Sequence, residues 1–343
     1  RFMKARIEPN TPINIPFRID EPLLWSPEEP NLYTVNIGIG PRQEDVVSVV
    51  TGFRKIEYST TALKINGKVT PINGVTLYHD RAAIGSALRT RHYDEDLEQI
   101  RDIGANAIRS GTAPHAQYLY DCCDQNGTLV WIDTPFTRAP YLSDVFYYST
   151  DKFKQNGLQQ MREVIIQNYN HPSIVVWGLS NEITASGTVN DDLLDNHRAL
   201  NELCHAMDKT RPTTMAHVFM LETDSPLIDI ADIGSYNLYF GWYIGELEQN
   251  DKFFDDYHKK FPTRVIGFSE YGADANPQYQ SKNAEKGDYS ETYQCVYHEH
   301  LLKCIEERPY LWATHAWNLF DFAADGRDEG GKNGENQKGL VTF

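Results

Sequence analysis

Two glutamates each directly follow an apolar run that is typical of a buried β-strand. Residues 174–180 lead into Asn181 and Glu182, and residues 264–269 lead into Glu270. Two carboxylates held about 5–5.5 Å apart suit a retaining glycosidase, in which one attacks the anomeric carbon and the other protonates the leaving oxygen. The acid must keep its proton near neutral pH, and both desolvation and a neighbouring carboxylate raise a carboxyl pKa.

These glutamates can act together only if the fold brings both to one place. From about residue 62, short apolar runs alternate with longer helical patterns, which is typical of a (β/α)8 barrel. The eight runs are Ile72–Val75, Ala107–Arg109, Leu129–Ile132, Ile174–Leu179, Thr213–Val218, Ile230–Ser235, Arg264–Phe268 and Leu311–Trp317. In such a barrel the carboxyl ends of the strands share one mouth, so we expect Glu182 and Glu270 to meet there.

A doubly wound open sheet is the alternative fold, but no GxGxxG motif follows the first strand. Residues 325–338 are rich in Gly, Asp, Glu and Asn, and we predict a polar loop after the last strand. A helix that would close the barrel is not visible before Phe343, so we expect the barrel of residues 62–343 to be truncated at its C-terminus.

Residues 1–61 are predicted to be all β, with strands at Ile13–Phe17 and Leu32–Ile37 and within Val46–Tyr58. This stretch is short for a sandwich of roughly 100 residues, so we interpret it as part of an immunoglobulin-like β-sandwich. The chain starts at Arg1 rather than Met, and we expect the natural N-terminus to be absent. The compartment stays open, with bacterial periplasm or cytoplasm expected.

The composition is that of a globular chain, with 41% apolar and 23% charged residues. The formal net charge of −16 argues against a general nucleic-acid binder or a protein of anionic membranes. No apolar run approaches the ~18–20 residues of a membrane span. The five cysteines show no redox or zinc spacing and are interpreted as buried free thiols. A homo-oligomer is compatible with this composition.

Several motifs, in order along nearly the whole chain, resemble glycoside hydrolase family 2. Residues 177–182 are similar to its acid/base signature, and residues 268–272 to its nucleophile signature. Further matches are Leu24–Tyr33 and Gly52–Arg54 in the immunoglobulin-like domain, Ile65–Lys68 and Asn73–Val75 at the start of the barrel, Tyr236–Tyr243, and Trp317–Phe322. The likeness is greatest to bacterial β-galactosidases, which implies a retaining exo-β-glycosidase acting on terminal β-galactosides of an oligosaccharide or polysaccharide-derived substrate.

The resemblance implies a role for each matching position. Glu182 would be the general acid/base, and Glu270 the nucleophile that carries the glycosyl intermediate. Asn181 would donate to the sugar 2-hydroxyl, Tyr239 would hydrogen-bond the nucleophile, and Trp317 would form a wall of the sugar pocket. No organic cofactor is expected, and neither a divalent metal nor a monovalent cation can be assigned.

Two further pairs are candidates for substrate binding. Asp80 and Arg81, after the first barrel strand, match an Asp-Arg pair of some members and could reach sugar hydroxyls. Asn336 and Lys338 form an Asn-x-Lys whose spacing binds the substrate carboxylate in β-glucuronidases of this family. A lysine supplies the charge opposite to glucuronate. A β-glucuronidase is therefore the alternative activity.

Three positions depart from the galactosidase pattern. Tyr78 stands where a His is usual, Thr112-Ala113-Pro114 replaces a His-Tyr-Pro, and Asp133 replaces a common Glu. Each lost bond to a sugar hydroxyl costs on the order of 1 kcal/mol. These departures favour a modified sugar or a particular oligosaccharide over plain galactose. They also leave a catalytically weak carbohydrate-binding protein as an alternative.

Overall fold

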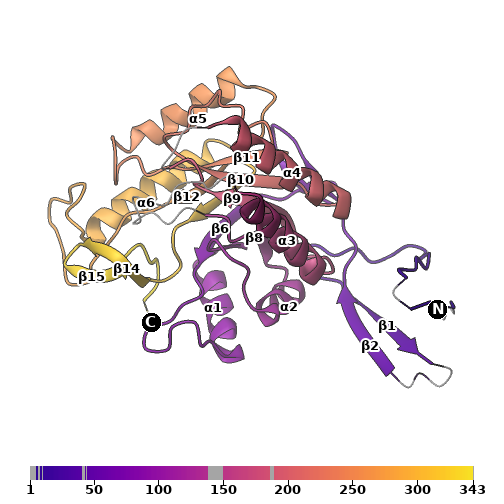
Figure 1. Cartoon of the computed structure of the whole chain (residues 1–343). Helices are drawn as coiled ribbons and strands as arrows, with labels where there is room; N and C mark the ends of the chain where they lie inside the picture. Colours follow the sequence, from indigo (N-terminus) through magenta and orange to yellow (C-terminus); the bar gives the residue numbers. More distant parts are fainter. Residues whose placement is uncertain are drawn as a thin grey trace.

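The central feature of the fold is a closed barrel of eight parallel strands. The computed structural model describes residues 5, 6, 8, 9, 11–40, 43, 45–137, 150–185 and 189–342. The barrel strands are β6 (Ile72–Leu77), β7 (Ala107–Ser110), β8 (Leu129–Asp133), β9 (Ile174–Asn181), β10 (Thr213–Val218), β11 (Ile233–Asn237), β12 (Ile266–Tyr271) and β13 (Ala313–Ala316). They pair in sequence order, and β13 closes the barrel against β6. The strands lie at the centre of the molecule (Figure 1). The predicted (β/α)8 fold is confirmed, with every expected run forming a barrel strand.

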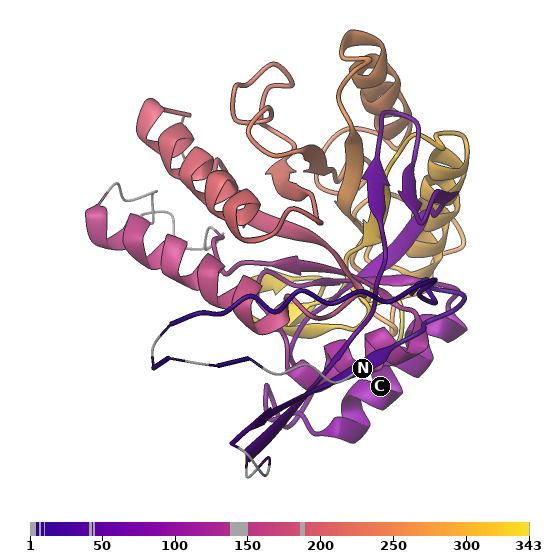
Figure 2. The same cartoon turned by 90° about the vertical axis from the view of Figure 1, so that its right-hand side faces the viewer.

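Helices surround these strands (Figure 2). They are α1 (Thr90–Asp102), α2 (Gln117–Asn126), α3 (Asp151–Asn168), α4 (Asp191–Met207), α5 (Glu248–Lys260) and α6 (Glu291–Glu306). Local sequence fixes several of their ends. The side chains of Thr150, Asn190 and Ser290 accept from the backbone of the first turn of α3, α4 and α6. Gly127 ends α2 with φ 75°, a left-handed conformation that suits glycine.

The core lies in two layers on either side of the strand wall. Between strands and helices, buried side chains such as Ile100, Leu119 and Ile165 pack together. Inside the barrel, a second cluster contains Trp131 and Trp312, whose ring centroids lie 5.3 Å apart. The strands are buried on both faces, which explains why they read as apolar runs rather than alternating ones.

The N-terminal part contains two of the three expected strand regions, at Leu32–Ile37 and within Val46–Tyr58, but not the one at Ile13–Phe17. It forms an antiparallel hairpin of β1 (Tyr33–Ile39) and β2 (Asp45–Thr51), which projects from the barrel in Figure 1. A three-stranded sheet follows, made of β3 (Ile56–Tyr58), β4 (Leu63–Ile65) and β5 (Lys68–Val69), so β3 and β4 lie on either side of the predicted domain boundary. Residues 13–17 form no strand, because Pro12 and Pro16 lack the N–H that a sheet ladder needs.

The N-terminal part also contacts the base of the barrel. The buried Trp25 donates its indole N–H to the Asp124 carbonyl at 2.8 Å. Arg54 donates to the carbonyls of Pro172 and Ile174, each at 2.7 Å. Burial lowers the pKa of Arg54 well below its usual value. These bonds hold the segment that leads into β9.

The polar segment after β13 is a β-hairpin rather than the predicted loop. Strands β14 (Phe322–Glu329) and β15 (Lys332–Asn336) pair antiparallel, with Glu329 opposite Lys332. The turn residues Gly330 and Gly331 have φ values of 64° and 78°. A two-residue turn with positive φ at both positions is the favoured hairpin connection, and glycine adopts it without a Cβ penalty. Among the described residues, no helix is both long and apolar enough to cross a membrane.

Candidate active site

Both sequence-predicted carboxylates lie at the carboxyl end of the barrel, and a shift in strand register precedes each. Opposite β10, strand β9 advances from Gly178 to Asn181 while β10 advances only from Thr214 to Ala216. Strand β12 likewise advances by an extra residue before Glu270. An extra residue of this kind bends a strand and redirects the next side chain, and such irregularities cluster beside active sites.

Glu270 is almost fully buried and is held at both oxygens. Arg109 donates from Nη1 to Oε1 at 2.7 Å, and Tyr239 donates from its hydroxyl to Oε2 at 2.9 Å. Burial, together with Glu270, raises the pKa of Tyr239 well above its ordinary value, so the phenol stays protonated and donates. The two bonds fix the orientation of the carboxylate. The predicted contact between Tyr239 and the nucleophile position is present.

Glu182 lies in the left-handed backbone region, with φ 48°. For a residue other than glycine this conformation is strained, and such strain is concentrated at functional sites. Its Oε1 accepts from Asn237 Nδ2 at 2.9 Å, and its backbone N–H donates to the Ala216 carbonyl at 2.9 Å. Asn237 is also the register partner of Glu270. One asparagine on β11 therefore joins the two carboxylate-bearing strands.

The side-chain oxygen of Asn181 accepts two hydrogen bonds within the site, whereas its amide nitrogen makes only one long contact. Oδ1 accepts from Arg109 Nη2 at 2.8 Å and from Asn237 Nδ2 at 3.2 Å. Because guanidinium nitrogens only donate, this contact fixes which side of the amide is oxygen. The nitrogen makes a long contact of 3.4 Å with the Thr137 hydroxyl. That arrangement leaves Asn181 suited to the predicted donation to a sugar hydroxyl.

Trp317 is half-buried and belongs to an aromatic group at the β6 and β13 side of the mouth. Its ring meets Phe322 edge-on at 5.7 Å and Tyr78 at 6.5 Å. Tyr78 stacks on Phe322 with centroids 4.2 Å apart. Aromatic faces of this kind pack against the C–H face of a ring. The position is compatible with the predicted wall of the sugar pocket.

Lys338 is buried, with an exposed fraction of 1%. Its ammonium pairs with Asp274 and donates to the Tyr243 hydroxyl at 2.5 Å. Arg327 contacts the same two partners, bonding Tyr243 at 3.0 Å and Asp274 at 3.2 Å. Burial lowers the pKa of Lys338 to about 8, although the Asp274 charge opposes that shift. Two cations thus surround one buried carboxylate beside Tyr239.

The remaining predicted residues lie in different places. Asn336 is buried at the end of β15, and its Oδ1 accepts from the backbone N–H of Lys338 at 3.2 Å, so it shapes the turn. Asp80 accepts from the Ala323 backbone at 2.8 Å and ties its loop to the hairpin. Arg81 is turned away toward α1, where it pairs with Glu95 and Asp96. The structure does not bring Arg81 to the two carboxylates.

Sequence reasoning missed Arg109, Asp274 and Arg327 as parts of this site. Arg109 is a charged residue inside the apolar run of β7, which in a barrel strand signals an inward-facing group. Asp274 follows the nucleophile motif by a few residues and carried no signal of its own. Arg327 lay within the segment predicted as a loop. The Gly-Gly pair between two polar runs was the available signal for that hairpin.

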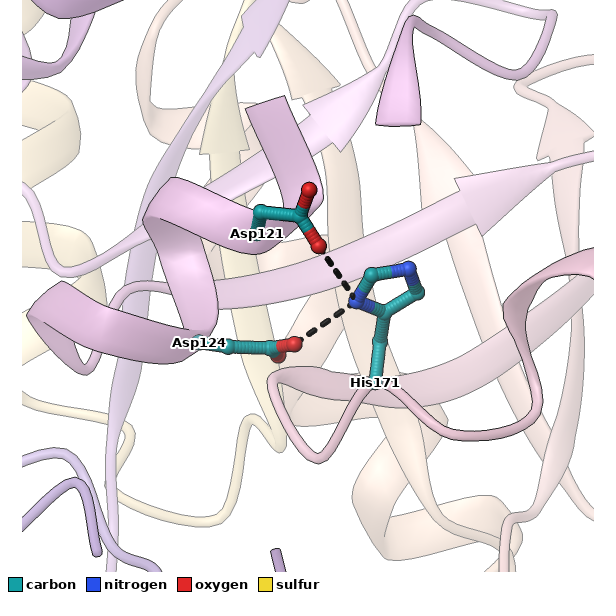
Figure 3. Close-up of side chains that lie close together, drawn as sticks. All are labelled: Asp121, Asp124 and His171. Carbon is teal, nitrogen blue, oxygen red and sulfur yellow. Dashed lines mark hydrogen bonds and ion pairs between the residues drawn. The ribbon is translucent and has the colours of Figure 1, made fainter. Parts of the chain in front are cut away.

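Asp121, Asp124 and His171 form a second cluster of possible metal ligands among the described residues (Figure 3). It lies near the starts of β8 and β9, at the opposite end of the barrel from the carboxylates. His171 Nδ1 is 2.6 Å from Asp124 and 4.0 Å from Asp121, and Nε2 is 3.1 Å from Gln117 Oε1. Both ring nitrogens face acceptors, so neither directs a lone pair at a cation. The cluster fits a structural role, in which it connects α2 to the segment that leads into β9.

Comparison with known families and proteins gives a consistent result. The family description "Glycosyl hydrolases family 2, TIM barrel domain" matches residues 56–341, and "Glycosyl hydrolases family 2" matches residues 3–54. The chain therefore belongs to glycosyl hydrolase family 2, as its motifs predict.

Three relatives illustrate the range within the family. A β-glucuronidase of Bacteroides fragilis is 39% identical over 338 residues, covering 96% of this chain and 48% of that protein. The crystal structure of an FMN-binding β-glucuronidase from Facaelibacterium prausnitzii L2-6 superposes with a TM-score of 0.89 at 41% identity, covering 93% of this chain and 49% of that one. A β-galactosidase of Thermoanaerobacter pseudethanolicus is 24% identical, covering 89% of this chain and 37% of that protein. The chain spans about half the length of the first two relatives.

Proposed function

We propose that this chain carries the catalytic barrel of a retaining β-glycosidase that removes terminal β-glucuronic acid. Glu270 attacks the anomeric carbon while Glu182 protonates the leaving oxygen, which gives a glycosyl ester on Glu270. Glu182 then takes a proton from water, and the water displaces the sugar with net retention. Arg109 and Tyr239 hold the nucleophile in position throughout, so little rearrangement is needed as the ester forms.

The buried ammonium of Lys338 is the observation that favours glucuronide over galactoside. An ammonium has three N–H donors, and Asp274 and Tyr243 take two of them. The Tyr243 oxygen accepts from both Lys338 and Arg327, so its own hydrogen points elsewhere. One donor on Lys338 and one on Tyr243 are therefore left for a ligand. Two such donors suit the two oxygens of a carboxylate, and bonds to a charged group contribute about 1.5–3 kcal/mol each.

The sequence favoured β-galactosides, and two sets of observations now favour the alternative. The relatives with the highest identities above are named β-glucuronidases, whereas the β-galactosidase is more distant. Tyr78 and Thr112 also replace histidines expected in a galactosidase pocket. Neutral galactose has no group that would use a buried lysine charge. We therefore place β-glucuronide ahead of β-galactoside.

A paired substrate assay tests this proposal. Hydrolysis of an aryl β-glucuronide and the matching aryl β-galactoside is measured for the parent protein and for Lys338→Met. We expect the parent to prefer the glucuronide and the substitution to lower kcat/KM for that substrate by roughly 10- to 100-fold, equivalent to one charged hydrogen bond. Lys154→Met is the control, because Lys154, although less buried than Lys338, is also paired with an aspartate and lies on α3. Preference for the galactoside, or equal loss on both substrates, contradicts the proposal.

A further inference from the structure

Asp133, at the end of β8, is a fully buried carboxylate with no step in the chemistry above. Its side chain is inaccessible to solvent, as is that of its partner Arg109. Asp133 Oδ2 lies 2.9 Å from Arg109 Nε and 2.8 Å from Nη2. Asp133 therefore holds one edge of the guanidinium group whose other nitrogens reach the active site.

The donors of Arg109 can be counted, because a guanidinium has five N–H bonds in a rigid plane. One of them, the Nε–H, donates to Asp133 Oδ2, and Nη2 lies 2.8 Å from the same oxygen in an ion pair. Three more point at the Ser269 carbonyl at 3.2 Å, Glu270 Oε1 at 2.7 Å and Asn181 Oδ1 at 2.8 Å. Since the group is planar, fixing one edge fixes the direction of the rest. The angle at which Arg109 meets Glu270 and Asn181 therefore depends on Asp133.

Asp133 itself is held from two sides. Its Oδ1 accepts from the Trp131 indole N–H at 2.6 Å. A Cβ placed on Gly178 would lie 2.0 Å from the same oxygen, so the glycine of the acid/base motif leaves the space that Asp133 fills. The Trp131 ring also packs against Arg109, with Cζ 4.8 Å from the ring centroid. These contacts leave Asp133 little freedom to rotate.

We propose that Asp133 is a positioning residue that aims Arg109 at the Glu270 carboxylate and at Asn181. The inference rests on the proposed glycoside hydrolysis, and it does not depend on which sugar is cleaved. Loss of the Asp133 charge weakens the Nε hydrogen bond and the Nη2 ion pair, and lets the guanidinium rotate away from the nucleophile. A misplacement of about 1 Å at a reacting group can cost on the order of 100-fold in rate.

If Asp133 positions Arg109, its protonation should change kcat/KM as the pH is varied. Burial raises the pKa of Asp133 to about 6, against the opposing effects of Arg109 and Trp131. Protonation removes the negative charge of Asp133, and this weakens both its hydrogen bond from Arg109 Nε and its ion pair with Nη2. The charged and titratable groups around it are Arg109 on β7, Glu270 on β12, Tyr120 on α2 and His315 on β13 beside Trp131. Burial lowers the pKa of His315 to about 3 and raises that of Tyr120, so neither of these two titrates near pH 6.

The test compares kcat/KM against pH for the parent, Asp133→Asn and Asp208→Asn on the aryl glycoside that the parent cleaves best. Asp208 is a matched control, because it is also a buried aspartate that accepts from a tryptophan, Trp177, and an arginine, Arg211, but at the C-terminal end of α4. We expect the parent to lose activity as the pH falls through about 6. Asp133→Asn is expected to lose roughly 100-fold at neutral pH and to lack this acid limb. Asp208→Asn keeps the parent profile even if its melting temperature falls.

Trp131→Phe covers the case in which Asp133→Asn does not fold. It removes the N–H that stabilises the Asp133 charge, so the acid limb moves to higher pH. An unchanged limb in Trp131→Phe, or an Asp133→Asn protein with parental rate and profile, overturns the positioning role alone. A folded parent that cleaves no glycoside of a broad aryl panel overturns the proposed function and this inference together.

Discussion

Lys338 lies over the ring of Tyr239, with its ammonium nitrogen 5.8 Å from the ring centroid. The hydroxyl of the same tyrosine donates to Glu270. The buried cation and the proposed nucleophile are therefore in contact with opposite parts of one side chain. Tyr239 therefore connects the residue that we propose binds the substrate carboxylate to the proposed nucleophile.

The first prediction concerns the nucleophile. Glu270→Gln keeps a side chain of the same size but cannot form the glycosyl ester, so turnover of every aryl glycoside is expected to fall below detection. A neutral amide also leaves Arg109 buried with less compensating charge, so thermal unfolding is recorded alongside. Steady-state hydrolysis by the folded variant checks this. Activity within tenfold of the parent, as a rough threshold, would remove Glu270 from the nucleophile role.

The acid/base role predicts a dependence on the leaving group. Glu182→Ala removes the proton donor, which contributes typically 10²–10⁴-fold in general acid catalysis. Substrates with poor leaving groups are expected to lose about that much, whereas activated aryl substrates still form the glycosyl–enzyme intermediate. A pre-steady-state burst of the aryl leaving group measures this step directly. Equal losses on activated and unactivated substrates are incompatible with the assignment.

The pH dependence of glucuronide binding follows from Lys338. Its pKa lies at about 8, so the ammonium is charged below that pH and loses its proton above it. The attraction for a substrate carboxylate is therefore present at neutral pH and falls as the pH rises through about 8. We expect kcat/KM for an aryl glucuronide to show this basic limb, because that constant reports groups of the free enzyme. A neutral aryl glycoside measured in parallel should show it much less, and identical limbs for both would count against Lys338.

Gly178 should not tolerate a side chain. Gly178→Ala places a methyl group 2.0 Å from Asp133 Oδ1 and 2.7 Å from the Trp131 indole nitrogen. Overpacking of this kind typically costs 1–3 kcal/mol, and the methyl would also displace Asp133, so both melting temperature and activity should fall. Gly157→Ala in α3 is the control, because its added methyl would meet nothing within 4 Å beyond the adjacent residues and the backbone of its own helix. That helical substitution should stabilise by roughly 0.5–1 kcal/mol. A Gly178→Ala protein as stable and active as the parent would show that the contact relaxes freely.

The barrel could be predicted because each of its strands is buried on both faces and reads as a short apolar run. Glu182 and Glu270 could be placed for the same reason, since each follows such a run and parallel strands end at a common mouth. The structure of the N-terminal part was harder to predict from the sequence. Residues 13–17 have the composition of a strand, but two prolines and the lack of a partner strand among the described residues leave them without strand pairing.

The rest of the site depends on contacts that sequence spacing does not encode. Arg327 reaches Asp274 and Tyr243, the partners of Lys338, from strand β14 of the hairpin. Tyr243 lies before α5 and is bound by both Lys338 and Arg327, which are far from it in sequence. Arg81 and Asp80 match the same family motif, but the Arg81 side chain forms an ion pair with an aspartate of α1. Side-chain direction in a loop is set by such competing charges.

Covalent labelling is the most direct test of the central claim. The protein is incubated with a 2-fluoro-glucuronyl fluoride, which forms the glycosyl ester but slows its hydrolysis, and is then digested and analysed by mass spectrometry. The account predicts a mass increase on the peptide that contains Glu270, and faster labelling than with the corresponding galactosyl reagent. Labelling of a different residue, or none with either reagent by the folded protein, would contradict it.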